Sequence, residues 1–241
     1  MTTKEFSDAF DTLLNGYSTQ MNFGDSASMG GMVLDEYEKS LFLTQAQEQI
    51  IVELYTGRND KTSSFEKTEE LRSNLRGLIK TDTPTESDKD FKGISKYSKF
   101  FILPKDVLFI TYEAATLSDE SAGCKNGTVI PVIPVTQDEF DRVMNNPFRQ
   151  ASKRRALRLD NGLDNDLNVA EIVTKYDIKD YTIRYLSKPT PIVLANLDGV
   201  SIDKVDKITE CKLDSAMHRY ILERAVALAI ASRSIQNRSN V

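Results

Sequence analysis

The sequence of 241 residues contains one histidine, two cysteines and no tryptophan. A single imidazole excludes any site built on two or more histidines, and it leaves His218 as the only base of that type. Cys124 and Cys211 are too few for a disulfide framework, and neither has a second cysteine at zinc-site spacing. The cysteine content therefore fits a reducing compartment.

Sequence motifs that bind phosphate or metal ions are also missing. Neither G-x-G-x-x-G nor G-x-x-x-x-G-K occurs. Three acids stand at the first, fifth and twelfth positions of a possible calcium loop: Asp160, Asp164 and Glu171. However, Gly162 occupies the third position and Asn165 the sixth, where that loop needs glycine. We therefore predict a turn there, and no catalytic residue, metal site or cofactor.

Long hydrophobic runs are absent as well. No stretch approaches the ~18 consecutive apolar residues of a membrane span, and the opening MTTKEFSDAF lacks the apolar core of a signal peptide. The net charge of −5 and the isoelectric point near 5.1 argue against a surface that binds nucleic acid everywhere. We expect a soluble cytosolic product without membrane contact, on which any nucleic-acid contact is local.

The hydrophobic pattern predicts helices at the start of the chain. Apolar residues recur every three or four positions over residues 4–15, 34–57 and 65–80, with Gly57 as a C-cap. A further long helix closes the chain, with Asp214 as its N-cap. We expect its apolar face to pack on the helix that carries Leu43, Ile50 and Leu54. The expected core residues are Leu213, Met217, Ile221, Ala225 and Leu228.

After Ser98 the period changes from about 3.6 towards 2. Runs rich in β-branched and aromatic residues predict strands, and one proline-rich run is a possible edge strand. The strand runs are FFILP, DVLFITYEAATL, GTVIPVIPV, RALRL, AEIVTKY and YTIRYL, and the edge run is KPTPIVL. Thr136 is the expected N-cap of a short helix between them. The expected fold is α+β, with N-terminal helices, a central antiparallel sheet and a long C-terminal helix, in one domain over 1–241 with flexible loops at 16–32 and 81–98.

The segment NNPFRQASKRRALRLD, residues 145–160, concentrates positive charge in this acidic chain. Six basic residues lie between Arg142 and Arg158, with Asp141 as the adjoining acid. Removing those six from the total of 31 leaves 25 basic residues elsewhere, against 36 acidic ones. Three interpretations stay open: a solvated surface, phosphate contacts with nucleic acid, or an interface with carboxylates of a partner protein. Charge type alone does not separate phosphate from carboxylate partners.

Five runs in a fixed order carry a resemblance to a known family. They are LDEYEKSLFLTQAQEQIIVELY, ILPKDVLFITYEA, VIPVTQDEFDRVMNNPFRQASKRRALRLD, YTIRYLSKPTPIVL and ECKLDSAMHRYILERAVALA. Together they resemble a structural protein of crAss-like tailed phages of Bacteroidetes. The resemblance is to the proteins that form a ring in the head-to-tail connector beneath the portal, and the portal adaptor is the first choice within that group.

The resemblance implies a non-enzymatic virion protein of the neck, made in the cytoplasm of the host bacterium. It implies a homo-oligomeric ring of about twelve copies, closed by heterologous contacts. The implied partners are the portal, adjacent connector or tail rings, and genomic DNA that passes without sequence specificity. We expect the basic side chains to meet carboxylates of the next subunit or of the portal, with DNA contact as the second possibility. These residues are Arg149, Lys153, Arg154, Arg155 and Arg158.

Three alternatives remain open at this point. The chain can belong to another ring of the tail or neck stack. A nucleic-acid-binding module would explain the basic run, and it predicts salt-sensitive binding of duplex DNA by the monomer. A small enzyme would need a cleft around His218 with acids such as Glu210 or Asp214, but we expect His218 to be a packed or capping residue.

Overall fold

The computed structural model describes residues 1–21, 34–57, 69–87, 91–118, 127–164 and 167–239. The chain forms two compact units where one domain was expected. Unit 1 comprises Met1–Leu78 and Pro189–Val241, and unit 2 comprises Ile79–Lys188, which is inserted between the two segments of unit 1. The α+β fold class is confirmed, because helices dominate unit 1 and strands dominate unit 2.

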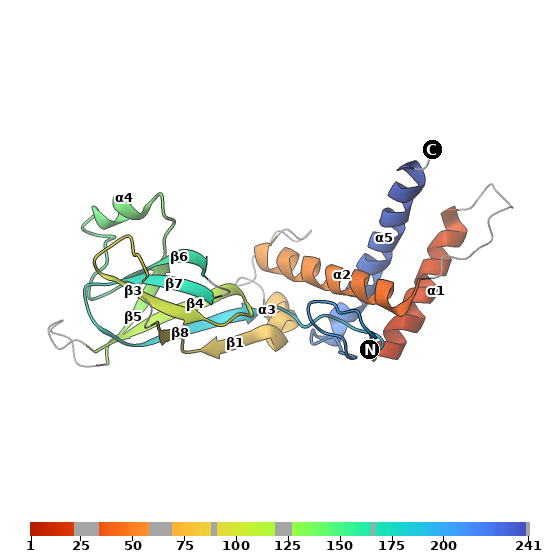
Figure 1. Ribbon diagram of the computed structural model, residues 1–241, viewed down its shortest axis with the longest axis horizontal. Helices are drawn as coiled ribbons and strands as arrows, with labels where there is room; N and C mark the ends of the chain where they lie inside the picture. Colours follow the sequence, from red (N-terminus) through yellow and green to blue (C-terminus); the bar gives the residue numbers. More distant parts are fainter. Residues whose placement is uncertain (22–33, 58–68, 88–90, 119–126, 165–166, 240–241) are drawn as a thin grey trace. The chain divides into compact units, whose positions relative to one another are not determined.

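Unit 1 is built on three long helices, α1 (Thr3–Met21), α2 (Glu36–Thr56) and α5 (Ser215–Ser239), and Figure 1 shows α5 crossing α2. All three were predicted. The N-cap Asp35 and Glu38 form a capping box at the start of α2. Gly57 ends α2 with a φ of 72°, a left-handed conformation that glycine adopts without steric cost. At α5, the side chain of Asp214 accepts the N–H of Ala216 at 2.9 Å, as expected of a cap.

The α5 helix packs against α2 and α1 through its apolar face. Four of the five expected core residues are buried, namely Leu213, Met217, Ile221 and Ala225. Leu228 is half-buried. Leu222, Val226 and Ala229 are buried on the same helix, so the buried face of α5 is wider than the predicted stripe.

A polar stripe on α2 holds the returning chain of unit 1. The side chains of Ser40, Thr44 and Gln47 are buried. Ser40 Oγ accepts the N–H of Leu194 at 3.0 Å, and Thr44 Oγ1 accepts the N–H of Ile192 at 3.1 Å. Gln47 Nε2 donates to the carbonyl of Thr190 at 3.1 Å. The spacing of the backbone groups matches that of the side chains on α2, because two extended residues advance ~6.6 Å and four helical residues advance ~6 Å.

These bonds explain why the run KPTPIVL is not the predicted edge strand. It is irregular apart from a single bridge between Val193 and Thr209. The backbone N–H groups of Ile192 and Leu194 are bound to side chains of α2, so these donors need no ladder to a neighbouring strand.

The predicted third helix is shorter than expected. The helix α3 covers Glu69–Leu75, the 3-10 turn η1 covers Arg76–Leu78, and strand β1 begins at Ile79. The chain therefore leaves unit 1 where the last predicted helical turn was expected. Residues 65–68 lie outside the described residues. Leu75 and Leu78 are buried.

Unit 2 is one sheet of eight strands in the order β1-β8-β4-β5-β6-β7-β3-β2 (Figure 1). All pairs are antiparallel except β5 with β6, which run parallel, so the sheet is mixed. The strands are β1 (Ile79–Asp82), β2 (Thr85–Glu86), β3 (Ser98–Leu103), β4 (Val107–Leu117), β5 (Val129–Pro134), β6 (Ala156–Asp164), β7 (Leu167–Val173) and β8 (Ile178–Ser187).

The sheet of unit 2 curls so that one face encloses a core. Phe101 of β3 packs on Tyr181 of β8 with ring centroids 5.1 Å apart, although four strands separate β3 from β8 in the sheet order. Contact across that span requires the two ends of the sheet to approach each other. Alternate residues of β3, β4, β5, β7 and β8 meet in this core.

Three expectations about loops and caps need correction or restriction. Residues 81–98, expected as a loop, contain the end of β1, all of β2 and the first residue of β3. Residues 16–21 of the other expected loop continue α1, and 22–32 lie outside the described residues. Thr136 does not cap the short helix, because α4 (Phe140–Met144) begins after a separate turn in which the carbonyl of Thr136 accepts the N–H of Glu139 at 3.2 Å.

Replacing Thr44 with Val preserves the shape of the side chain but removes the hydroxyl that binds Ile192. We expect unit 1 to lose about 1–3 kcal/mol of unfolding free energy, because a buried N–H would remain unpaired. Thr56→Val is the matched control, since Thr56 is exposed and its hydroxyl donates to the carbonyl of Val52 in its own helix. Urea denaturation should separate the two variants, and equal stability would contradict the anchoring role of the stripe.

Two glycines allow a second test, in which substitution by alanine is expected to change the unfolding free energy in opposite directions. A Cβ at Gly77 would lie 2.8 Å from the carbonyl oxygen of Lys212, whereas a Cβ at Gly16 in α1 would meet nothing within 4 Å. We expect Gly77→Ala to lower the unfolding free energy by more than about 1 kcal/mol. Gly16→Ala should raise it by about 0.5–1 kcal/mol, because alanine favours the helix interior. Thermal unfolding of both variants measures this, and a stable Gly77→Ala would refute the close approach.

Candidate assembly surface

The basic run begins on a short helix that packs on the outer face of the sheet. Phe140 and Val143 of α4 are buried against Leu157 and Leu159 of β6 and Val173 of β7. Alternation along β6 therefore directs the two leucines to α4, while Ala156 faces the enclosed core. This packing holds the chain that leaves α4 against the sheet.

The turn between α4 and β6 is ordered by its own hydrogen bonds. The carbonyl of Asn146 accepts the N–H groups of Arg149 at 3.0 Å and of Gln150 at 2.9 Å. The side chain of Asn146 also accepts the N–H of Phe148 at 2.9 Å. Ser152 and Arg155 exchange two backbone bonds of 2.9 and 3.2 Å around a tight turn. The backbone that carries the side chains of this turn is therefore fixed by local hydrogen bonds.

Phe148 is the most exposed of the large apolar residues that the structure describes, at 87%. Its neighbours Arg149, Lys153 and Arg154 are exposed, and Arg155 is half-buried. Within the described part of the chain, no ion pair engages any of these four cations. We call this group, Phe148, Arg149, Lys153, Arg154 and Arg155, the tip surface. An exposed aromatic ring among arginines is typical of interface anchors.

Arg158 differs from the other predicted surface residues. Its side chain is 11% exposed, and its Nε lies 3.0 Å from Oε2 of Glu113, which is 5% exposed. Asp160 forms a second ion pair with its guanidinium. The structure therefore places Arg158 in an internal ion pair between β6 and β4, apart from the tip surface. Arg142 is also engaged, since it pairs with Glu139.

The partner of Arg158 is a buried carboxylate, whose removal from water costs free energy. Glu113 Oε2 accepts the hydroxyl of Tyr181 at 2.8 Å. Burial raises the pKa of Glu113, and the positive charge of Arg158 offsets part of that rise. Burial and the adjacent carboxylate also raise the pKa of Tyr181. The three groups form a polar cluster inside unit 2, joined by the Arg158–Glu113 ion pair and the Tyr181–Glu113 hydrogen bond.

His218 occupies a packed position. Its ring is buried, its Nε2 lies 3.2 Å from the carbonyl oxygen of Leu213, and the ring of Phe6 packs beside it at a tilt of 49° with centroids 5.2 Å apart. Burial lowers the pKa of His218. Asp214 is used as a helix cap and Glu210 is exposed, so the cleft that an enzyme would need around His218 is not formed by these residues.

Other candidate sites in the described residues have little chemical content. No group of three or more His, Cys, Asp or Glu side chains in these ranges is arranged to hold a metal ion. The acids of the calcium-like segment lie on the hairpin of β6 and β7, where Asp160 is paired with Arg158 and Glu171 accepts the N–H of Ile94 at 2.8 Å. Among the helices described, none combines the length and apolarity of a membrane span.

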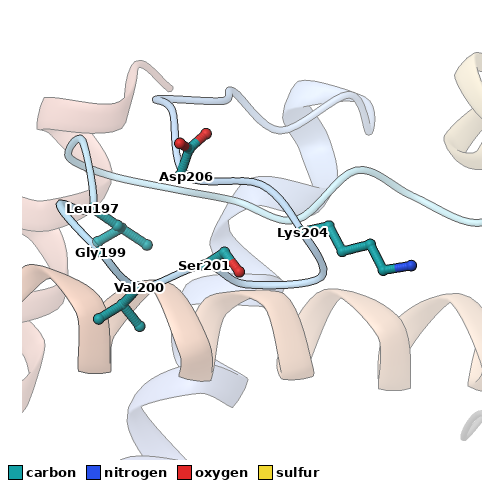
Figure 2. Close-up of a pocket in the computed structure, with 6 residues that line it drawn as sticks. All are labelled: Leu197, Gly199, Val200, Ser201, Lys204 and Asp206. Atoms are coloured by element: carbon teal, nitrogen blue, oxygen red, sulfur yellow. The ribbon is translucent and has the colours of Figure 1, made fainter.

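A pocket of about 390 Å³ lies on a surface loop of unit 1. Figure 2 shows its six lining residues: Leu197, Gly199, Val200, Ser201, Lys204 and Asp206. The side chains of Lys204 and Asp206 point in different directions, so they do not converge on one ligand atom (Figure 2). This arrangement lacks the paired groups of acid–base or nucleophilic catalysis.

Replacing Arg158 with Met should destabilise unit 2 by about 3 kcal/mol, because Glu113 would remain buried without its cation. The pKa of Glu113 would rise further. A carboxyl group with a raised folded-state pKa stabilises the fold below its unfolded pKa, and that stability is lost as pH rises through the folded pKa. The deficit of the variant should therefore shrink as pH falls. Arg154→Met, at an exposed position, should change stability by less than about 0.5 kcal/mol. Equal effects of the two variants in urea denaturation would contradict the distinction.

Comparisons with known proteins cover both units. The family model for Phage tail ring protein 3/4 matches residues 1–240. Ring protein 3 of Bacteroides phage crAss001 is 48% identical over 236 residues, which cover 97% of each chain. Ring protein 4/5 of the same phage is 32% identical over 245 residues, which cover 96% of this chain and 93% of that protein. The predicted resemblance to a crAss-like phage ring protein is confirmed, and the chain belongs to the phage tail ring protein 3/4 family.

Proposed function

We propose that this chain is a non-enzymatic virion protein that forms a closed homo-oligomeric ring in the head-to-tail connector beneath the portal. The ring would surround a channel through which the genome passes during packaging and ejection. The observation that carries the proposal is the tip surface, which presents an exposed aromatic ring and four cations that have no ion-pair partner in the described chain. Such a surface suits contact with a partner, and membership of a ring protein family supports further copies as that partner.

The distribution of charge between the units supports contacts between copies. Residues 79–188 hold 17 of the 31 basic residues and 17 of the 36 acidic residues. Unit 2 is therefore neutral in total, and the remaining 14 basic and 19 acidic residues give unit 1 the whole net charge of −5. A cationic surface on a neutral unit and an acidic second unit are complementary. Complementary potentials favour association of different surfaces, which is the contact that a closed ring needs.

The net charge also suits a conduit. A strongly basic channel would hold DNA by counterion release, whereas an acidic or mixed lining lets the duplex slide. The cations of the tip surface are concentrated on one turn, so we assign them to a protein contact first. Contact with the passing DNA is the second candidate, because guanidinium groups also bind phosphates.

The names of two relatives support a place within a stack of rings. One phage carries relatives of this chain called Ring protein 3 and Ring protein 4/5. We propose that this ring likewise adjoins related rings, with the portal as its neighbour on the head side. Cryo-electron microscopy of the virion neck tests this order. A ring separated from the portal by other proteins would leave the ring proposal intact and overturn the role of direct portal adaptor.

The double substitution Arg154→Glu and Arg155→Glu tests the tip surface. Like charges facing each other across a desolvated contact cost several kcal/mol, so we expect ring occupancy in particles to fall about tenfold or more. The monomer should fold normally, because neither arginine forms an ion pair in the described chain and surface charges contribute little to stability. Occupancy is scored in micrographs of the neck, together with infectivity.

Lys105→Glu with Lys179→Glu is the matched control, since it reverses the same number of charges in unit 2, both at exposed positions. It should leave ring occupancy at the wild-type level. Full occupancy of the tip variant with abnormal packaging or ejection would favour DNA contact. Full occupancy with wild-type infectivity would discard both functional assignments.

A further inference from the structure

The outer face of α2 combines apolar and acidic side chains. Leu41 and Val52 are 44% and 40% exposed on this helix. The only basic residue of α2, Lys39, has a side chain that is 5% exposed and is bound to Asp11 at 2.7 Å and Glu36 at 3.0 Å. The charged groups that α2 presents to solvent are therefore all carboxylates. This face has the chemistry that an aromatic residue flanked by arginines would recognise.

A depression of about 500 Å³ lies on this face of α2 near its C-terminal end. Val52 and Thr56 contribute the apolar and small side chains, and the other lining residues are Glu48, Gln49 and Glu53. Glu53 already pairs with Arg224 of α5. A carboxylate accepts several hydrogen bonds, however, so an incoming guanidinium can share these acids with their present partners.

We propose that the tip surface of one copy docks on this face of α2 in the next copy, with Phe148 against Val52 and Arg149 facing the carboxylates of Glu48 and Glu53. The proposal rests on the ring proposed above and names its subunit contact. The occupant is a second copy because the two surfaces complement each other in charge, and both belong to this chain. Phe148 would bury an aromatic side chain that supplies about 150–250 Å² of contact.

The contact joins two different surfaces, one on unit 2 and one on unit 1. An open chain of copies then keeps one unused tip surface at one end and one unused α2 face at the other until the ring closes. A contact between the tip surfaces of two subunits would instead give a two-fold dimer and would bring like charges together. Charge therefore selects the arrangement that forms rings.

Crosslinking between two variants tests the contact directly. One chain carries Asn145→Cys, at an exposed position beside the tip surface, and the other carries Thr56→Cys, at the exposed edge of the depression. The two chains carry different tags and are coexpressed with the portal and neighbouring ring proteins, and rings are isolated and treated with a short bismaleimide. We expect a crosslinked species that contains both tags. Each variant alone controls for the native Cys124 and Cys211, and should give no dimer.

The outcomes separate this inference from the ring proposal. Rings that form without a species carrying both tags would overturn the docking arrangement while the ring itself stands. A dimer of the Asn145→Cys variant alone would show a contact between two tip surfaces and would also overturn it. Failure of the unmodified protein to form rings under these conditions would count against the ring proposal.

Substitution of the anchor gives a second measurement. Phe148→Ala should weaken subunit association by about tenfold or more, because a buried aromatic anchor carries a large share of the binding energy of an interface. Tyr112→Ala is the control, as Tyr112 is an exposed aromatic residue of β4 in the same unit. Its variant should associate as the wild type does. Analytical ultracentrifugation compares the two, and unchanged association of Phe148→Ala would contradict the anchor role.

Discussion

The buried polar stripe of α2 is the contact on which unit 1 depends. Unit 1 is assembled from two chain segments, and the second returns only after the whole of unit 2. Ser40, Thr44 and Gln47 bind the backbone of this returning segment by side-chain hydrogen bonds. An apolar stripe would have buried the N–H groups of Ile192 and Leu194 without partners, at a cost of a few kcal/mol. The anchored segment then leads the chain towards α5, whose apolar face completes the core with α1 and α2.

In unit 2, an ion pair provides partners for polar groups that are buried. The enclosed face of its curled sheet holds Glu113, Arg158 and Tyr181, and each of these polar groups has a partner within the cluster. The arginine thus supports the fold, while the cations before it in the sequence remain available at the surface. The position of a basic residue in the sequence therefore does not tell whether its side chain is internal or at the surface, because successive residues of a strand point to opposite faces.

Assembly through such surfaces needs no reactive group. The turn that carries Phe148 is held by backbone bonds and by the packing of α4, so little conformational entropy remains to be lost when a partner arrives. In the proposed contact, cations on this turn and acids on α2 would give an association that is directional and self-limiting in a closed ring. The buried His218 and the capping Asp214 are accounted for by the fold of unit 1.

The sequence alone determined the elements whose signals are local. The periods of α1, α2 and α5, the caps at Gly57 and Asp214, and the alternation of the strands are all set by neighbouring residues. The basic run and the family resemblance were also visible there. Tertiary structure decided the rest: the curl that brings β3 to β8, the inward direction of Arg158, and the attachment of residues 190–194 to α2. Each of these depends on a partner far away in the chain, and no local period or spacing encodes which distant group will satisfy a buried donor or charge.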